Sequence, residues 1–532
     1  MPGVFERVIE NWLTSANERS YHIPFCQLLA AEGETIIYVS PHGPFEQGKD
    51  VITLDKKGKP RGYQLKAGDI GLAEWRRHKG EINDLVEMPI NHPAIIPSRQ
   101  HIPFLVTNGE IKDTAIKAVM SSNEAWRQRK YPPLRTIAKG ELLKRFLAAH
   151  GSYLPQEVSE FKLFMELVVR DGREPVDKER LSAFIESILP LKSARKPNGR
   201  ELKRALASAL LLIGYILEPA YRVENHWAVF EGWTMAAAYV LALTSKMDMP
   251  EIDWSGQFRL CELAALDALS SMCRECETRA HFLEGDALTD GQFYGVRMTI
   301  IAGLASALAL YGRVEKAELE HMEFIRKFVA ECLPKMKIWG ESAIPYFVLV
   351  ALCLESNGQQ IVGESHVIAA MRAILETNSR RDHNKGLPST YYSAEQAIRL
   401  MTNLDDPDLR EDFEGGTYTV QPLIDFLTRR WRRQALREVW YLVTANTIRS
   451  FYPSTSSEWF RWRSEEGALN SRIAGSPQSW AALIRDVEAI DVTVLPRLLR
   501  AKPSFAIFFV LVYPHRFTRE MLKLIESAVV SA

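Results

Sequence analysis

Hydrophobic and polar positions change their period near residue 150, and the change divides the chain into two kinds of structure. Before it, apolar residues at positions 5, 8, 9, 12 and 13 have helical spacing, whereas residues 35–40 (TIIYVS) and 102–107 (IPFLVT) have the composition of strands. After it, long segments with alanine-rich apolar faces predominate. The pattern predicts an α/β domain over residues 1–150 and a large, irregular all-α region over residues 151–532.

The first segment predicts the order α-α-β-β-β-α-β-α-β-α, a mixed central sheet flanked by helices. Strands are expected at residues 35–40, 51–54, 62–66, 102–107 and 134–138. Helices are expected at residues 5–13, 24–32, 110–127 and 141–149. The second and third strands flank the turn sequence KKGKPR, so they should form a hairpin.

The second segment predicts helices with no repeat of fixed period, which excludes a regular solenoid. They are expected at residues 155–170, 178–188, 201–217, 228–246, 257–277, 295–312, 314–333, 366–378, 422–450 and 519–530. A loop over residues 405–418 suggests a subdivision near residues 380–420. Nothing in this region names a ligand, so sensing, DNA binding and oligomerisation remain alternative roles for it.

Composition adds little about partners but favours a cytoplasmic protein. The chain has 66 basic and 66 acidic side chains, and its six cysteines do not have the spacing of a disulfide framework. The amino end, MPGVFERVIENWL, lacks the apolar core of a signal peptide. The apolar runs are shorter than the roughly 20 residues of a spanning helix, so no membrane association is expected.

One short stretch gathers groups that suit phosphate chemistry. Asp50 opens a predicted strand, and Gln64 and Lys66 lie two apart on the next, so both point to one face. Asp50, Gln64 and the nearby Glu46 offer hard oxygen ligands of the kind that Mg²⁺ binds. Lys66 adds a positive charge that would stabilise a developing phosphorane. The pattern suits metal-assisted hydrolysis of a phosphodiester bond.

Asp50 followed by Gln64-x-Lys66 resembles the D-(x)n-(E/Q)-x-K signature of the PD-(D/E)xK nuclease superfamily, in the variant of Mrr-like restriction endonucleases. The resemblance covers about residues 1–150 and implies a restriction-endonuclease-like fold. Residue by residue, Asp50 becomes the main metal ligand, Gln64 the second ligand and Lys66 the catalytic lysine. The superfamily often adds a helix-borne acid, for which Glu10, Glu18 and Glu46 remain alternatives.

This resemblance implies a Mg²⁺- or Mn²⁺-dependent DNA endonuclease, and the fusion to a helical region is similar to bacterial restriction or anti-phage defence effectors. A homo-oligomer and a partner protein from a defence system are implied in the same way. Two departures bear on the site, since Lys49 replaces the motif's proline and Gln64 is neutral. The alternative is a catalytically inactive nuclease fold that acts as a scaffold for nucleic acid or protein.

Two basic stretches are candidates for contacts with a phosphate backbone. Residues 56–79 contain eight basic and two acidic side chains. The candidate contacts near the site are Lys49, Lys57, Arg61, Arg76, Arg77 and Lys79. Residues 429–437 contain five arginines. For both stretches the alternative is a solvated or ion-paired surface.

Overall fold

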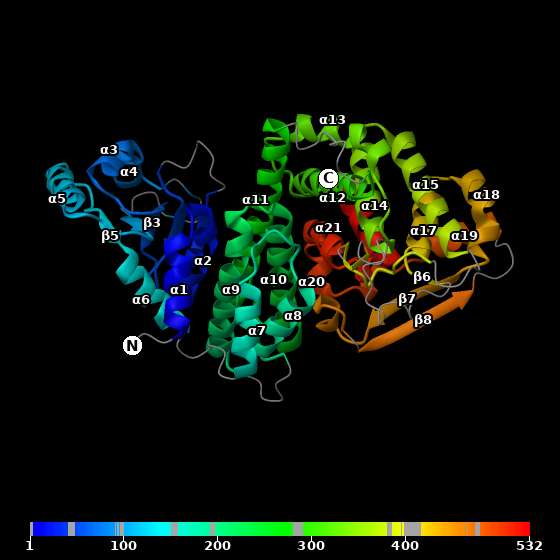
Figure 1. The fold of residues 1–532 in the computed structure, drawn as a ribbon, viewed down its shortest axis with the longest axis horizontal. Coiled ribbons are helices and arrows are strands. Elements are labelled where there is room, and N and C mark those ends of the chain that lie inside the picture. The colour runs from blue at the N-terminus through cyan, green and yellow to red at the C-terminus, as the bar shows by residue number, and fades with distance from the viewer. Residues whose placement is uncertain are drawn as a thin grey trace. The chain divides into compact units, whose positions relative to one another are not determined.

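The structure is a computed structural model (Figure 1). It describes residues 4–40, 48–90, 92, 95, 101–150, 158–191, 197–279, 291–379, 386–394, 396–397, 416–464, 466–473 and 479–531. The chain divides into two compact units, residues 1–267 and residues 268–532. The first unit therefore extends well past residue 150, where the change of hydrophobic period placed a domain boundary.

The first unit is built around a five-stranded mixed sheet in the order β1-β2-β3-β4-β5. Strands β1, β2 and β3 are antiparallel neighbours, and β4 and β5 continue the sheet in parallel with β3. The strands are β1 (Thr35–Val39), β2 (Val51–Leu54), β3 (Pro60–Lys66), β4 (Ile102–Thr107) and β5 (Arg135–Ile137). The mixed sheet is confirmed, and the order of elements differs from the prediction in one place, since two helices rather than one lie between β3 and β4.

Helices flank this sheet on both faces (Figure 1). They are α1 (Val4–Ser15), α2 (Glu18–Ala31), α3 (Leu72–Arg77), α4 (Lys79–Glu87), α5 (Asp113–Gln128) and α6 (Lys139–His150). On the α2 face, Phe25 packs edge-on against Tyr63, whose ring stacks on Phe104. On the other face, Trp75 and Trp126 pack in a core with Leu105. These buried aromatic side chains hold the helices against β3 and β4.

Four further helices belong to the same unit: α7 (Val158–Val168), α8 (Lys178–Ile188), α9 (Gly199–Arg222) and α10 (His226–Met247). Helix α9 packs along α2, and a Cβ atom at Gly214 would lie only 2.6 Å from the Pro24 ring. Trp12 and Tyr215 meet with ring centroids 4.2 Å apart. The sheet and these helices therefore share one core.

The second unit consists mainly of helices, together with a small sheet that the sequence pattern did not predict. Its helices include α12 (Gly291–Glu315), α13 (Met322–Cys332), α14 (Ile344–Ser356), α15 (Gln360–Asn378), α17 (Val420–Arg429), α18 (Arg433–Val443), α19 (Trp480–Glu488), α20 (Arg497–Arg500), α21 (Pro503–Val512) and α22 (Arg519–Ser531). Helix α11 (Ser255–Thr278) spans the division between the units.

A three-stranded sheet in the order β6-β7-β8 corrects the expectation that everything after residue 150 is helical. Its strands are β6 (Gly416–Thr417), β7 (Thr447–Pro453) and β8 (Gly467–Ile473). The segment 422–450 was predicted as one helix. Instead, α17 ends just before Trp431, whose φ of 58° is incompatible with a helix. Helix α18 follows, and β7 begins after it.

Two described helices have the length and hydropathy of a membrane span, Glu201–Arg222 and Phe293–Glu315. Their apolar windows are 94% and 78% buried within the protein, as in core helices of a globular fold. Each helix is longer than the apolar run within it, so the length of the run alone does not set the length of the helix.

The arginine-rich stretch 429–437 is largely ion-paired. Arg430 contacts Glu355 at 2.5 Å and Glu526 at 2.6 Å, and Arg429 contacts the same Glu526 at 2.5 Å. Arg432 pairs with the buried Glu364. These contacts join α17 and the following turn to α14, α15 and α22, which favours a structural role for the three arginines.

Buried histidines should make the protein less stable in mild acid. Burial lowers the pKa of His101 and of His366 to about 4, and that of His515 also falls well below 6.5. The unfolded chain binds more protons below pH 6.5, so the stability is full above this pH and decreases as the pH falls toward 4. One histidine shifted this far contributes about 3 kcal/mol.

The variant His366→Phe isolates one share of this effect, because a phenyl ring keeps the stacking on Phe347 at a centroid distance of 4.6 Å. We expect the melting temperature to drop less between pH 7 and pH 4.5 in this variant than in the wild type. Thermal unfolding at several pH values measures the difference. Parallel pH curves for the two proteins would contradict the assignment.

Candidate active site at the ends of β2 and β3

Asp50, Gln64 and Lys66 lie close together at one end of the β2–β3 hairpin. The Asp50 N–H donates to the Tyr63 carbonyl at 2.8 Å, and the Asp50 Oδ2 accepts from the Leu65 N–H at 2.5 Å. Asp50 thus binds the backbone on both sides of Gln64. Both Asp50 and Gln64 are buried, with 2% and 3% of their surface exposed.

The Gln64 amide can lie in two orientations, and in one of them both its oxygen and its nitrogen have a hydrogen-bond partner. In that orientation its oxygen accepts from Lys66 Nζ at 3.3 Å and its nitrogen donates to the Gly48 carbonyl at 2.6 Å. In the reverse orientation the nitrogen makes only a long contact of 3.4 Å with Glu81 Oε2. We favour the first, which places an oxygen donor beside the lysine ammonium.

The Lys66 ammonium group lies between two carboxylates from different helices. Its Nζ lies 2.9 Å from Glu81 Oε2 on α4 and 3.8 Å from Glu18 Oε2 at the start of α2. Burial acts to lower the pKa of Lys66, but Glu18, Glu81 and Asp50 outweigh it, so the pKa is raised. Lys66 is therefore a cation at neutral pH.

Helix α2 places two uncharged side chains, Tyr21 and Cys26, next to the cluster. Tyr21 is fully buried, and its hydroxyl donates to the Lys66 carbonyl at 2.7 Å. Burial raises its pKa, as do the neighbouring Glu18 and Asp50. Burial likewise raises the pKa of the Cys26 thiol, again with a contribution from Asp50. Both side chains therefore stay neutral beneath the cluster.

Gly48 allows the chain before β2 to approach α4. Its φ is +72°, which favours glycine, and a Cβ atom there would lie 2.3 Å from the Glu81 carbonyl and 2.6 Å from the Leu85 nitrogen. This close approach brings the chain leading into Asp50 next to the helix that carries Glu81.

Of the two alternatives for the helix-borne acid that the structure describes, Glu18 Oε2 lies 3.8 Å from Lys66 Nζ. Glu10 instead pairs with Lys139 at 3.4 Å, so the structure brings Glu18 and not Glu10 to the cluster. Glu46 lies outside the described residues. The acid Glu81 also lies at the cluster but was not among the predicted residues. It lies on α4, three residues after His78, and α4 follows β3 in the chain.

Two of the predicted DNA contacts do not reach the surface as free cations. Lys49 is only 2% exposed, its Nζ donates to the Asp84 carbonyl at 3.2 Å, and burial lowers its pKa to about 8. The prediction that Lys49 contacts DNA is therefore wrong. Arg61 pairs with Glu34 at 2.5 Å and with Asp55 at 3.3 Å, so its charge is already compensated.

The remaining basic candidates fall into two places. Lys57 is exposed at the hairpin turn. Strand β3 starts just after this turn and spans about 20 Å from its first residue to Lys66, so Lys57 lies far from the cluster. Arg76, Arg77 and Lys79 are exposed on α3 and at the start of α4, on the side of the sheet that carries Glu81. Only these last three lie on elements next to the cluster.

The donor set suits a hard divalent cation held partly by other ligands. Asp50 offers a carboxylate and Gln64 an amide oxygen, with Glu18 and Glu81 nearby. Mg²⁺ is usually bound by one or two carboxylates together with waters and substrate phosphates. Within the described residues no group of three His, Cys, Asp or Glu side chains could hold a metal ion. A Mg²⁺ or Mn²⁺ ion at this site would therefore take most of its ligands from waters and substrate phosphates.

Comparisons with known proteins find no matching family model, no matching curated protein and no matching solved structure.

Proposed function

We propose that residues at the ends of β2 and β3 hydrolyse phosphodiester bonds of DNA with the help of Mg²⁺ or Mn²⁺. The observation that carries the proposal is the convergence of Asp50, Gln64 and Lys66. The Asp50 carboxylate accepts from the backbone N–H between Gln64 and Lys66, and the Gln64 amide oxygen accepts from the Lys66 ammonium. The antiviral role, the partner protein and the oligomer implied by the resemblance belong to this proposal as its biological setting.

Each side chain has a defined task in this proposal. Asp50 and Gln64 would hold the metal ion, with Glu18 or Glu81 as the further acid, and the bound ion would lower the pKa of a water and polarise the phosphoryl oxygen. Lys66 would leave its carboxylate partners and stabilise the negative charge that develops on the phosphate. Arg76, Arg77 and Lys79 would contact the DNA backbone without reading its sequence.

Cleavage of supercoiled plasmid in Mg²⁺, Mn²⁺ or EDTA tests the proposal, with RNA of similar length as a second substrate. Asp50→Asn keeps an acceptor for the Leu65 N–H but removes the charge, so we expect it to lose cleavage by about a hundredfold or more. Asp55→Asn is the matched control, because Asp55 accepts backbone N–H groups in the turn at the far end of the hairpin.

Equal cleavage by the wild type and Asp50→Asn would overturn the assignment. Folded wild type that binds DNA but cuts neither substrate in either metal would favour the inactive scaffold instead.

A further inference from the structure

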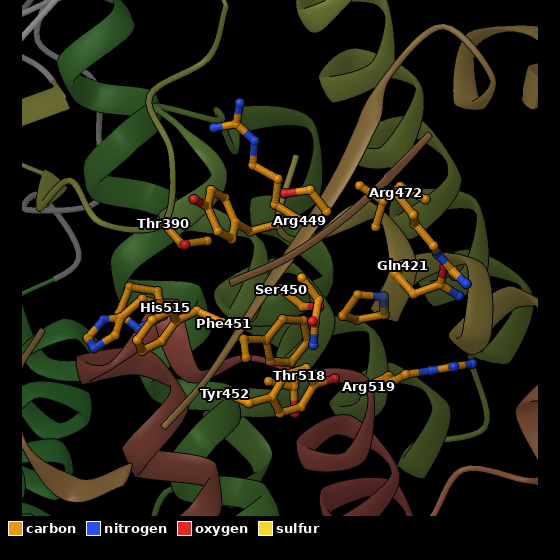
Figure 2. A pocket seen from close by; sticks show the side chains of 17 residues that line it. Thr390, Gln421, Arg449, Ser450, Phe451, Tyr452, Arg472, His515, Thr518 and Arg519 are labelled. Atoms are coloured by element: carbon orange, nitrogen blue, oxygen red, sulfur yellow. The ribbon is translucent and has the colours of Figure 1, made fainter. Parts of the chain in front are cut away.

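The second unit contains a cavity that is distinct from the nuclease-like site. It has a volume of about 240 Å³ and is bordered by β7, β8, the start of α17 and the turn before α22. Figure 2 shows its lining side chains, and all of them come from residues 390–519. The volume lies just below the usual range of about 300–1,000 Å³ for small-molecule sites, which limits the ligand to a small one.

One end of this cavity presents polar atoms without a hydrogen-bond partner. Thr390 is 1% exposed, and its hydroxyl has no partner. His515 is 5% exposed, and neither of its ring nitrogens has one. Buried polar groups without partners are costly, so a ligand that pairs with them would gain binding energy. Figure 2 shows both side chains on the same side of the cavity.

His515 is held in place by aromatic rings rather than by hydrogen bonds. Its ring stacks on Tyr391 at 5.4 Å and meets the edge of Trp462 at 4.9 Å. Burial lowers its pKa, and the nearby Arg516 and Arg463 lower it further, so the imidazole is neutral at pH 7. A neutral imidazole offers one donor and one acceptor, and the Thr390 hydroxyl offers both. This end therefore suits a ring edge that carries both kinds of group.

The lining also offers flat apolar surfaces. Its aromatic members besides His515 are Tyr418, Phe451, Tyr452 and Phe517. Stacking of a base on such side chains contributes to nucleotide binding and depends little on the identity of the base.

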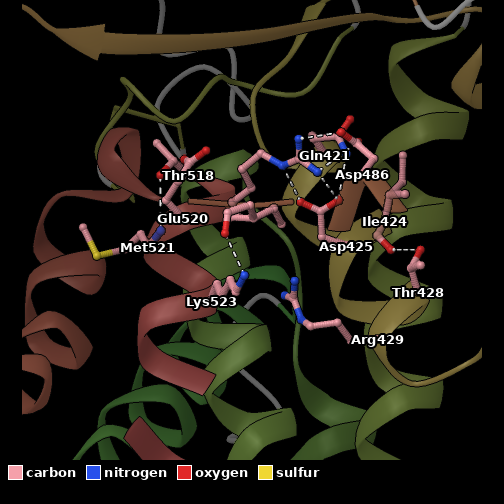
Figure 3. Close-up of polar contacts among 12 residues, drawn as sticks. Gln421, Ile424, Asp425, Thr428, Arg429, Asp486, Thr518, Glu520, Met521 and Lys523 are labelled. Carbon is pink, nitrogen blue, oxygen red and sulfur yellow. Dashed lines mark hydrogen bonds and ion pairs between the residues drawn. The ribbon is translucent and has the colours of Figure 1, made fainter. Parts of the chain in front are cut away.

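The opposite end of the cavity is cationic. Among the described residues, the lining includes Arg472 and Arg519 at this end and no Asp or Glu at either end. Arg519 pairs with Asp425 at 2.9 Å and with Asp486 at 3.0 Å, and neither carboxylate belongs to the lining. Figure 3 shows these two aspartates near Gln421. Arg472 donates to Gln421, whose amide in turn donates to Asp425 at 2.9 Å. Since the charge of Arg519 is compensated, Arg472 supplies the attraction for an anion at this end.

From these features we infer that the cavity binds a nucleoside monophosphate, with the base at Thr390 and His515 and the phosphate at Arg472. This inference does not depend on the proposed nuclease activity. The limited volume excludes a dinucleotide, and the separation of polar and cationic ends distinguishes the site from one for inorganic phosphate alone.

Calorimetric titration of the full chain with AMP, GMP, CMP and UMP tests the inference. The corresponding nucleosides and inorganic phosphate serve as partial ligands. We expect at least one monophosphate to bind about tenfold or more tightly than its nucleoside and than phosphate. Binding of none of the four monophosphates, or of phosphate as tightly as the best of them, would overturn the inference.

Variants locate the two ends of the ligand. Arg472→Gln should weaken the monophosphate by about tenfold and leave the nucleoside unchanged. His515→Phe keeps the ring packing and should weaken both by about tenfold, whereas His366→Phe, a matched change at a buried histidine away from the cavity, should change neither. If His515→Phe does not fold, Thr390→Val tests the same end. Wild-type affinity in Arg472→Gln, or in the variant that tests the base end, would overturn the assignment.

Discussion

Lys66→Met should reduce DNA cleavage by about a hundredfold or more while leaving the protein folded. The change removes the positive charge that the proposed mechanism places beside the phosphate, but it keeps the length and apolar stem of the side chain. Glu18 and Glu81 then lose their shared cation. Since their side chains are 31% and 51% exposed, water can solvate them and the cost in stability is small.

Single-turnover cleavage at saturating Mg²⁺ measures this effect, and the melting temperature reports on folding. Lys139→Met is the matched control, because Lys139 also pairs with a helix-borne acid, Glu10, in the same unit but outside the cluster. A Lys66→Met variant that cuts as fast as Lys139→Met would remove Lys66 from the chemistry.

Glu341→Ala should destabilise the second unit by about 4 kcal/mol. Glu341 begins a short 3-10 helix (Glu341–Ala343) and has no exposed surface. Its Oε2 accepts from the N–H groups of Tyr418 and Thr419 at 2.8 Å each, and from the hydroxyls of Thr417 and Thr419 at 3.0 and 2.7 Å. Truncation leaves these four buried donors without an acceptor.

Amide hydrogen exchange measures this loss locally. The Tyr418 and Thr419 amides should exchange much faster in Glu341→Ala, whereas the Leu65 amide in the first unit should not change. Glu341→Gln keeps one acceptor oxygen and should fall between the two proteins. Since Tyr418 lines the cavity, monophosphate binding should weaken together with the protection. Unchanged exchange at both amides would show that Glu341 does not hold this segment.

The elements around the first sheet were predictable because their signals are local. TIIYVS, IPFLVT and the KKGKPR turn each carry strand or turn chemistry within a few residues, and the structure places strands there. The small sheet of the second unit lacks such signals. Strands TIRSFYP and GALNSRI have no apolar alternation, and they form because they pair with each other across a loop.

The candidate site shows the same division. Asp50, Gln64 and Lys66 could be selected from sequence because a hairpin sets their spacing. The choice of Glu18 over Glu10, and the presence of Glu81, depend on how α2 and α4 pack on the sheet. Likewise, only packing reveals that Lys49 points into the core toward Asp84. Charge in a sequence does not say whether a lysine is solvated.

The packing of α2 on α9 bears on how this protein can change in evolution. The surface that α1 and α2 present to α9, which includes Trp12 and Pro24, would be exposed and apolar in a fragment ending at residue 150. Recombination at residue 150 would therefore yield a product that aggregates rather than a domain that folds on its own. A gene fusion that inherits the sheet in working form must carry the next hundred or so residues with it.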